Sequence, residues 1–243
     1  MKKILFLILF FSAFTKIFAC KCVDESIAKK YLEADVVALV TIEKTYGEKE
    51  NNPAGTGLRT YSADLKFEKI YKGMTFKTLN IFGTTTSLSS GACEKLVMKG
   101  EKYLILLSKN KDGLYFVSSC STMPKIFEDK FLNEYENIFK VIEKNKANLH
   151  FPKFVQYDDM SEDYNQQKKQ ITNDFLKLNK KRLRGKLGIY KVKINDDDKI
   201  SEIIPIQKIG IKEKQIQELM KKNLRIFRGK SFKTDEYFIL LEL

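Results

Sequence analysis

The chain has 243 residues, of which 31% are charged and 43% hydrophobic, and its formal net charge is +13 at pH 7. The lysines are spread along the whole chain and form no stripe interleaved with aromatic residues, so the charge indicates a solvated basic surface and argues against nucleic-acid binding. His150 is the only histidine, and we interpret it as a linker or packing residue, so we expect no His-based metal site, serine triad or Cys–His pair. We therefore expect a protein that is not an enzyme and needs no cofactor.

Residues 1–19 have the pattern of a secretion signal. Residues 1–3 give a basic start, residues 4–14 form an apolar run too short to span a bilayer, and Ala19 is a small residue before a cleavage point. Cleavage there would leave 224 residues with a net charge of +10, beginning at Cys20. No later run approaches membrane-spanning length. We therefore expect a protein that is secreted or held in the periplasm or outer cell envelope.

The mature chain would keep all four cysteines, which are Cys20, Cys22, Cys93 and Cys120. Export places their thiols in an oxidising compartment, where an even number is expected to pair, and four cysteines permit three pairings. A zinc site built from all four is an alternative, but strong zinc signatures use two closely spaced pairs, whereas Cys93 and Cys120 are isolated. Disulfides are the favoured interpretation.

Between residues 35 and 120, short β-rich runs alternate with turn signals, which predicts a small closed sheet. We expect five strands, at residues 35–42, 61–71, 77–82, 103–107 and 114–119. The fourth is nearly all apolar and should be central. Five short strands in one compact unit fit a partly open Greek-key barrel of the OB type, so the predicted fold class is mainly β.

A helix and a second, smaller unit are expected after the barrel. Pro124 is placed at the first helical position, and apolar residues from Phe127 to Ile142 recur at helical spacing, so this helix should pack on the barrel. A polar connection follows, with a candidate helix at 161–178 and an acidic cluster from Asp158 to Asp163 that we interpret as solvated. Two strands at 187–194 and 200–209, a helix at 212–222 and a last strand at 236–243 then predict a ββαβ unit of α+β type. The expected division is a signal at 1–19, a domain at 20–148, a linker at 149–184 and a second domain at 185–243.

Several motifs between Cys20 and about Ile142 belong together. They are Cys20-Lys21-Cys22, Ala34-Asp35-Val36-Val37, Phe67-Glu68-Lys69-Ile70-Tyr71-Lys72-Gly73, Gly91-Ala92-Cys93, Gly100-Glu101-Lys102-Tyr103-Leu104-Ile105 and Cys120. In this combination the segment resembles the netrin-like module, and within it the inhibitory domain of the tissue inhibitors of metalloproteinases.

The resemblance implies the disulfides Cys20–Cys93 and Cys22–Cys120, which sequence alone cannot choose among the possible pairings. In that family the freed terminal amine and carbonyl displace the water bound to the zinc of a metalloproteinase. The resemblance therefore implies that Cys20 chelates, in trans, the zinc of a target protease and that Lys21 points into its specificity pocket. The remaining residues of the implied binding ridge are Cys22, Val23, Ser89, Ser90, Gly91 and Ala92.

Three features depart from the family pattern. The residue after the first cysteine is usually a small Ser or Thr, whereas Lys21 would bring an ammonium group into a commonly apolar pocket. Leu32 stands where the family has a cysteine of a third disulfide in this domain. The family's cysteine-rich second domain is replaced by a tail without cysteine.

The tail more weakly resembles the carboxy-terminal domain of TonB-type energy-transducing proteins, through residues 188–194, the acidic turn 195–198, residues 200–210, the helix and the last strand. Such domains bind partners by adding a strand at a sheet edge, which implies an envelope protein as partner. A second alternative concerns Cys20, because residues 17–20 partly match a bacterial lipoprotein cleavage box. A lipid anchor at Cys20 would remove the chelating amine and leave an odd thiol. Two hypotheses therefore stand: a metalloproteinase inhibitor, and an envelope protein-binding module without inhibitory activity.

Overall fold

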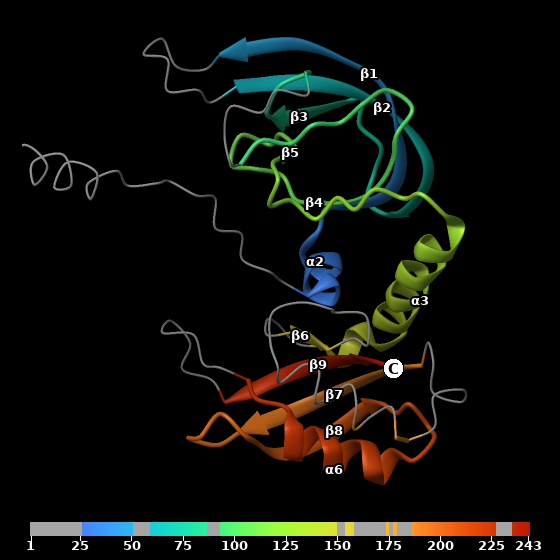
Figure 1. Ribbon diagram of the computed structural model, residues 1–243, viewed down its shortest axis with the longest axis vertical. Coiled ribbons are helices and arrows are strands. Elements are labelled where there is room, and N and C mark those ends of the chain that lie inside the picture. The colour runs from blue at the N-terminus through green and yellow to red at the C-terminus, as the bar shows by residue number, and fades with distance from the viewer. Residues whose placement is uncertain are drawn as a thin grey trace, which may run out of the picture.

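The structure of the chain, a computed structural model, describes residues 26–50, 59–86, 93–149, 154–157, 174, 177–178, 186–226 and 235–243. These residues form two β-sheets and three α-helices, so the protein is mainly β, as the sequence predicts. Figure 1 shows the sheets at opposite ends of the molecule, with two helices between them and the third helix beyond the second sheet. The described part of the chain therefore has four layers: the first sheet, two helices, the second sheet and the third helix.

The first sheet has five strands in the order β4-β1-β2-β3-β5. Neighbouring strands are antiparallel except β3 and β5, which run parallel. The strands are β1 (Val36–Glu50), β2 (Arg59–Lys72), β3 (Thr78–Phe82), β4 (Lys102–Leu107) and β5 (Phe116–Val117). All five predicted strands are present, although β1 continues beyond its predicted end at residue 42 and β5 is shorter than the predicted 114–119. The β1–β2 register shifts at several points, and such irregularities bend and twist a ribbon.

Closure of this sheet into a barrel is not seen in the described residues. A closed ring of five strands needs five neighbouring pairs, and four of them are present among the described residues. An isolated bridge, Lys109–Tyr115, joins the chain just after β4 to the residue just before β5. The free edge of β4 is instead lined by the segment 122–126: Leu104 N–H donates to the carbonyl oxygen of Pro124 at 3.0 Å. The OB-type barrel stays a prediction.

Pro124 lies in this extended edge segment, and the helix that it was predicted to open begins five residues later, as α3 (Asp129–Asn145). Ile126 N–H donates to Lys102 O at 2.9 Å, so the segment keeps pairing with β4 past the proline. A proline has no N–H to donate and is tolerated in such an edge position. Pairing with β4 therefore delays the start of the helix.

Strand β1 serves two hydrophobic cores because successive side chains point to opposite faces of a strand. Val36, Ala38, Val40 and Ile42 face the interior of the curved sheet with Ile105 and Leu107. Val37 and Leu39, with Leu104 and Leu106 of β4, face the helices. This explains why the sequence of β1 and β4 is nearly continuously apolar.

Helices α2 (Ile27–Glu33) and α3 lie between the two sheets and join them through one continuous core. Tyr31 of α2 stacks on Phe139 of α3, with ring centroids 4.5 Å apart. The same core includes Leu187 and Leu240 of the second sheet, both buried. The first sheet, the helices and the second sheet therefore bury one another's apolar side chains.

The second sheet has the order β6-β9-β7-β8, formed by β6 (Phe154–Tyr157), β7 (Leu187–Ile194), β8 (Ile200–Gln207) and β9 (Glu236–Glu242). Helix α6 (Glu213–Asn223) covers its outer face through Ile216 and Met220, which are fully buried. The order β7-β8-α6-β9 is the predicted ββαβ pattern. Strand β6 was not predicted; it pairs in parallel with β9 from within the expected polar linker.

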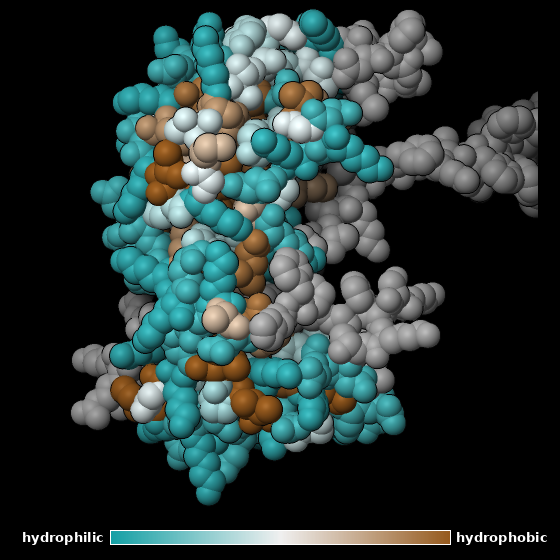
Figure 2. Space-filling view, turned by 180° about the vertical axis from the view of Figure 1, so that it is seen from behind, coloured by the Kyte–Doolittle hydropathy of each residue, from teal (hydrophilic) through white to brown (hydrophobic). Residues whose placement is uncertain are grey.

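Among the described residues, no helix combines the length and the apolar character that crossing a membrane requires. The face shown in Figure 2 is mostly hydrophilic, with hydrophobic side chains in small separate groups.

Candidate functional site

The residues of the predicted binding ridge lie outside the described part of the chain. They are Cys20, Lys21, Cys22, Val23, Ser89, Ser90, Gly91 and Ala92. The structure does describe what surrounds their attachment points, which are Cys93, Cys120, helix α2 and the segment 83–86 that leads toward Ser89. These described segments are the supports of the predicted ridge.

Cys93 and Cys120 are both disulfide-bonded, and their segments lie side by side. The N–H of Ser119 donates to the carbonyl oxygen of Cys93 at 3.1 Å, which places the residue before Cys120 directly against Cys93. The turn at Cys120 is closed by serine side chains: Cys120 N–H donates to Ser118 Oγ at 3.2 Å, and Ser118 N–H to Ser121 Oγ at 2.9 Å. The predicted partners of the two cysteines, Cys20 and Cys22, lie outside the described residues, so the pairing stays a prediction.

The chain enters and leaves residues 87–92 at neighbouring positions, which are fixed by backbone contacts. Lys95 N–H donates to the carbonyl oxygen of Phe82 at 2.7 Å. Gly83 has φ +142°, and a Cβ at this position would lie 2.5 Å from Lys95 O. Only glycine allows so close an approach of the two backbones. The segment that carries Cys93 is thus held directly against the end of β3.

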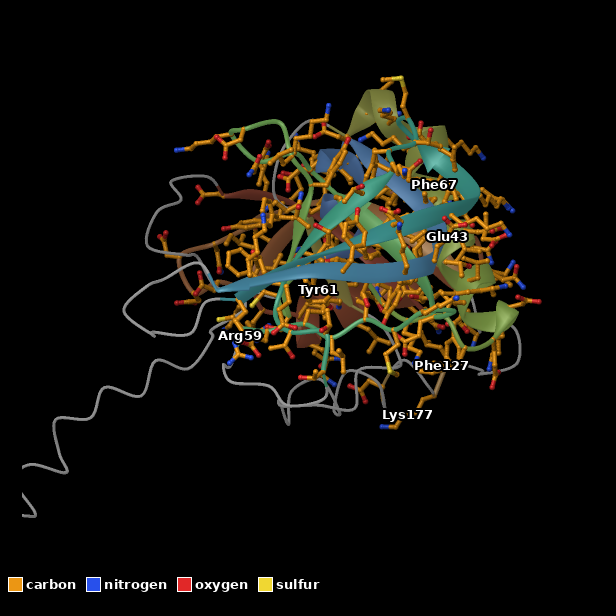
Figure 3. The ribbon with its side chains drawn as sticks, turned by 90° about the horizontal axis from the view of Figure 1, so that it is seen from above. Glu43, Arg59, Tyr61, Phe67, Phe127 and Lys177 are labelled. Atoms are coloured by element: carbon orange, nitrogen blue, oxygen red, sulfur yellow. The ribbon has the colours of Figure 1, made fainter. Side chains whose placement is uncertain are left out.

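Tyr61, on β2, supports the segment after Cys93 from inside the sheet (Figure 3). Its hydroxyl donates to Lys95 O at 3.0 Å and accepts from Val97 N–H at 3.0 Å. The side chain is 2% exposed, and burial raises the pKa of the phenol to about 12, so the hydroxyl stays protonated and can make both bonds. The irregular segment 94–98 therefore has a buried side-chain anchor.

Helix α2 carries the chain away from the predicted ridge and is fixed at both ends. Ser26 Oγ accepts the N–H of Lys29 at 3.2 Å, which caps the first turn. At the other end Lys72 Nζ donates to Tyr31 O at 3.1 Å and to Leu32 O at 2.8 Å, and partial burial lowers the pKa of this ammonium. A cation at the carboxyl end of a helix is favourable because the last carbonyls lack partners. Lys72 thus fixes the carboxyl end of α2 at Leu32, the position where the resemblance implies a cysteine.

A shallow pocket of about 260 Å³ lies between α2, the end of β4 and the turn at Cys120. Its lining includes Lys30, Glu33, Ser118, Cys120 and Ser121. It offers hydroxyls and one ion of each sign but no arrangement of nucleophile and base. Within the described ranges, no group of three or more His, Cys, Asp or Glu side chains could hold a metal ion.

Sequence reasoning named the cysteines but assigned no supporting role to Tyr61, Gly83 or Lys72, although Lys72 is part of the motif 67–73. Tyr61 and Lys72 belong to β2, where their types fit any strand, and their roles appear only when strand register brings distant segments against them. Gly83 had a local signal, since a glycine directly after a strand often marks a close approach of another backbone. The sequence alone does not say which backbone that is.

The family model for tissue inhibitor of metalloproteinase matches residues 18–144 of the chain. The match begins next to Cys20, includes the whole five-stranded sheet, both cysteine-bearing segments and α2, and ends within the last turn of α3. No curated protein matches the chain at a significant level. The match stops before the second sheet, so the resemblance of the tail to TonB-type domains stays a prediction.

Proposed function

The chain belongs to the tissue inhibitor of metalloproteinase family, and from this membership we propose that it is an exported, non-enzymatic inhibitor of a zinc metalloproteinase. The observation that carries the proposal is the extent of the family match, which spans every residue of the predicted ridge. The adjacency of Cys93 and Cys120 supports it, because two disulfides from these positions would bring Cys20 and Cys22 to one place.

In the proposed mechanism, the α-amine and carbonyl oxygen of Cys20 fill the open coordination position of the target's zinc. Catalytic zinc sites keep one position for water or substrate, so a bidentate N,O donor can occupy it without displacing the protein ligands. An α-amine has an ordinary pKa of about 7.7–8.0 and loses its proton readily beside a cation. The pairings Cys20–Cys93 and Cys22–Cys120 would hold both donor atoms in position.

Preorganisation is what the fold contributes to the affinity. Donors that are already fixed lose little motion on binding, so more of the interaction energy appears as affinity. The described supports fit this role: Gly83 and Tyr61 hold the segment of Cys93, the serine-closed turn holds Cys120, and Lys72 holds α2. A barrel of OB type, closed around this sheet, would stiffen the same supports further.

The alternative function is an envelope protein-binding module with Cys20 lipidated. Lipidation would convert its sulfur to a thioether and could acylate its amine, so one of the remaining three cysteines would lack a partner within the chain. Both described cysteines are disulfide-bonded. The inhibitor hypothesis expects Cys20 and Cys22 as their partners, whereas a lipidated Cys20 would leave one cysteine of the chain unpaired.

The experiment that tests the proposal compares three forms of the exported, full-length protein. Intact-mass measurement first establishes whether the chain begins at Cys20 with a free amine. The wild type, a form with one alanine added ahead of Cys20 and a control with one alanine added after Leu243 are then titrated against a panel of zinc peptidases. We expect inhibition by the wild type and the control, and loss of inhibition in the form extended at Cys20. An acylated terminus, or equal inhibition by all three forms, would rule out chelation by the amine.

A further inference from the structure

Glu48, near the outer end of β1, makes a contact that the family-like motifs do not explain. Its Oε2 accepts the backbone N–H of Thr85 at 2.9 Å and the Thr85 hydroxyl at 2.7 Å. Its Oε1 lies 3.4 Å from Nη1 of Arg59, at the start of β2. One carboxylate therefore joins the β1–β2 ribbon to the chain that follows β3.

Thr85 stands two residues before the start of residues 87–92, the stretch that contains the predicted contacts Ser89 to Ala92. The turn around it is compact, because the buried Thr84 hydroxyl donates to Thr86 O at 2.8 Å and its oxygen accepts Thr86 N–H at 3.2 Å. On the neighbouring side, Gly83 N–H donates to Arg59 O at 2.9 Å. The entry to residues 87–92 is thus attached to the β1–β2 ribbon through both Glu48 and Arg59.

The contact is charge-assisted. The backbone N–H of Thr85, and after it the Thr85 hydroxyl, lower the pKa of the Glu48 carboxyl, with a smaller effect from Arg59. Glu48 is therefore ionised at neutral pH, and hydrogen bonds to an ionised acceptor are stronger than those between neutral groups. This acceptor orients both the hydroxyl and the amide of Thr85.

We infer that Glu48 is a positioning residue of the inhibitory surface, which fixes the approach to residues 89–92 through its two hydrogen bonds to Thr85. The inference rests on the proposed function. It adds a determinant of affinity that lies on a different strand from the ridge and does not touch the target. Loss of the contact leaves the disulfides in place but removes the attachment of Thr85 to the β1–β2 ribbon.

A purely structural role is the competing explanation, because Glu48 and Arg59 face each other across the β1–β2 ribbon and their ion pair could serve only the ribbon. Substitutions of Thr85 distinguish the positioning role from the ribbon role. Replacing Thr85 by Val removes the hydroxyl bond and leaves the ion pair of Glu48 with Arg59 intact, whereas Thr85→Ser restores the hydroxyl. A ribbon role predicts no effect of either change on inhibition.

The test uses the full exported chain and the zinc peptidase that the wild type inhibits most strongly. We expect Thr85→Val to raise the inhibition constant by roughly 5- to 10-fold, the effect of losing one charge-assisted hydrogen bond, and Glu48→Ala, which removes both bonds to Thr85, to raise it at least as much. Glu48→Gln, which keeps an acceptor, should recover part of the loss, and Thr85→Ser most of it. The matched control is Glu43→Ala, which removes an exposed glutamate from the same strand (Figure 3).

Unfolding by urea is measured for each variant, so that a loss of folded protein is not mistaken for a loss of affinity. An unchanged inhibition constant in folded Glu48→Ala, or an equal rise in Glu43→Ala, overturns the role of Glu48 while the inhibitor function stands. If the wild type inhibits no peptidase of the panel, the proposed function itself fails and the positioning role fails with it.

Discussion

Gly73 lies so close to Asp35 that a Cβ on the glycine would be 2.0 Å from the Asp35 carbonyl oxygen. The two residues come from separate motifs, residues 34–37 and residues 67–73. The carboxylate of Asp35 also accepts Lys109 N–H at 2.8 Å, so it ties the start of β1 to the end of β4. The two motifs therefore meet at one corner of the sheet.

We predict that Gly73→Ala destabilises the protein for two reasons that a control can separate. Gly73 has φ +78°, where an alanine costs about 1–2 kcal/mol, and the clash with Asp35 O adds to this. Gly47 has φ +70° but nothing within 4 Å of its Cβ position, so Gly47→Ala should show the conformational cost alone. Urea unfolding of both variants measures the difference. Equal losses in the two variants would show that the corner can open at no cost.

The carboxylate of Glu136 links α3 to β2 and should make stability depend on acid pH. Its Oε1 accepts the hydroxyl of Tyr71 at 2.6 Å and Lys69 Nζ at 2.9 Å. The Tyr71 hydroxyl, and then Lys69, lower the pKa of Glu136 below its ordinary value. A depressed folded-state pKa means that the stabilisation is present above the unfolded pKa of about 4.3 and is lost as pH falls through the folded value.

We therefore expect the free energy of unfolding to fall from about pH 5 downward, and Glu136→Gln to make this fall shallower. The variant is less stable than the wild type at pH 7 and approaches it at pH 3. Glu134→Gln, on the same helix, removes an equal charge without the Tyr71 contact and should keep the wild-type slope. Urea unfolding at a series of pH values checks this, and identical slopes for the wild type and Glu136→Gln would contradict it.

The junction between α3 and the second sheet contains a buried amide contact that should stabilise the whole chain. Asn145 is 8% exposed, and its Nδ2 donates to Gln207 Oε1 at 2.7 Å and to Val141 O at 2.8 Å. Asn145→Ala should cost about 1–3 kcal/mol, since it removes both bonds and leaves the Gln207 oxygen without this donor. The exposed Asn137→Ala on the same helix is the control. Hydrogen exchange that rises in β7 and β8 as well as in α3 would show the coupling, and a rise confined to α3 would argue against it.

The strands could be predicted from the sequence where apolar side chains recur locally, and the failures occur where pairing is non-local. Strands β1 to β4 carry runs of β-branched and apolar residues, so their positions follow from pattern alone. Helix α2 has seven residues, too few for a helical period to be visible, and is stable only through Tyr31 and its neighbours in the core. Strand β6 has four residues and pairs with β9, about eighty positions later in the chain, which no local pattern indicates.

The candidate site shows the same division. Cys20, Cys93 and Cys120 stand out because cysteine is rare here and an exported chain is expected to pair its thiols. Glu48, by contrast, is one of many charged residues, and its role appears only when β1, β2 and the chain after β3 are brought together. Strand register determines which side chains contact the segments of a binding site, and register is set by pairing over the whole sheet.

Lys21 is the residue that should decide which proteases are inhibited. In the proposed mechanism Lys21 comes directly after the chelating Cys20 in the chain and points into the specificity pocket. Moving its ammonium group from water into an apolar pocket is unfavourable. Lys21→Thr should therefore lower the inhibition constant for peptidases with apolar pockets by about tenfold or more, and raise it for a peptidase with an acidic pocket. Lys21→Met keeps the length of the side chain without its charge, so it separates the effect of charge from the effect of side-chain length. Inhibition constants of the three forms across a panel of peptidases measure the effect, and the same selectivity in all three would mean that residue 21 does not enter the pocket.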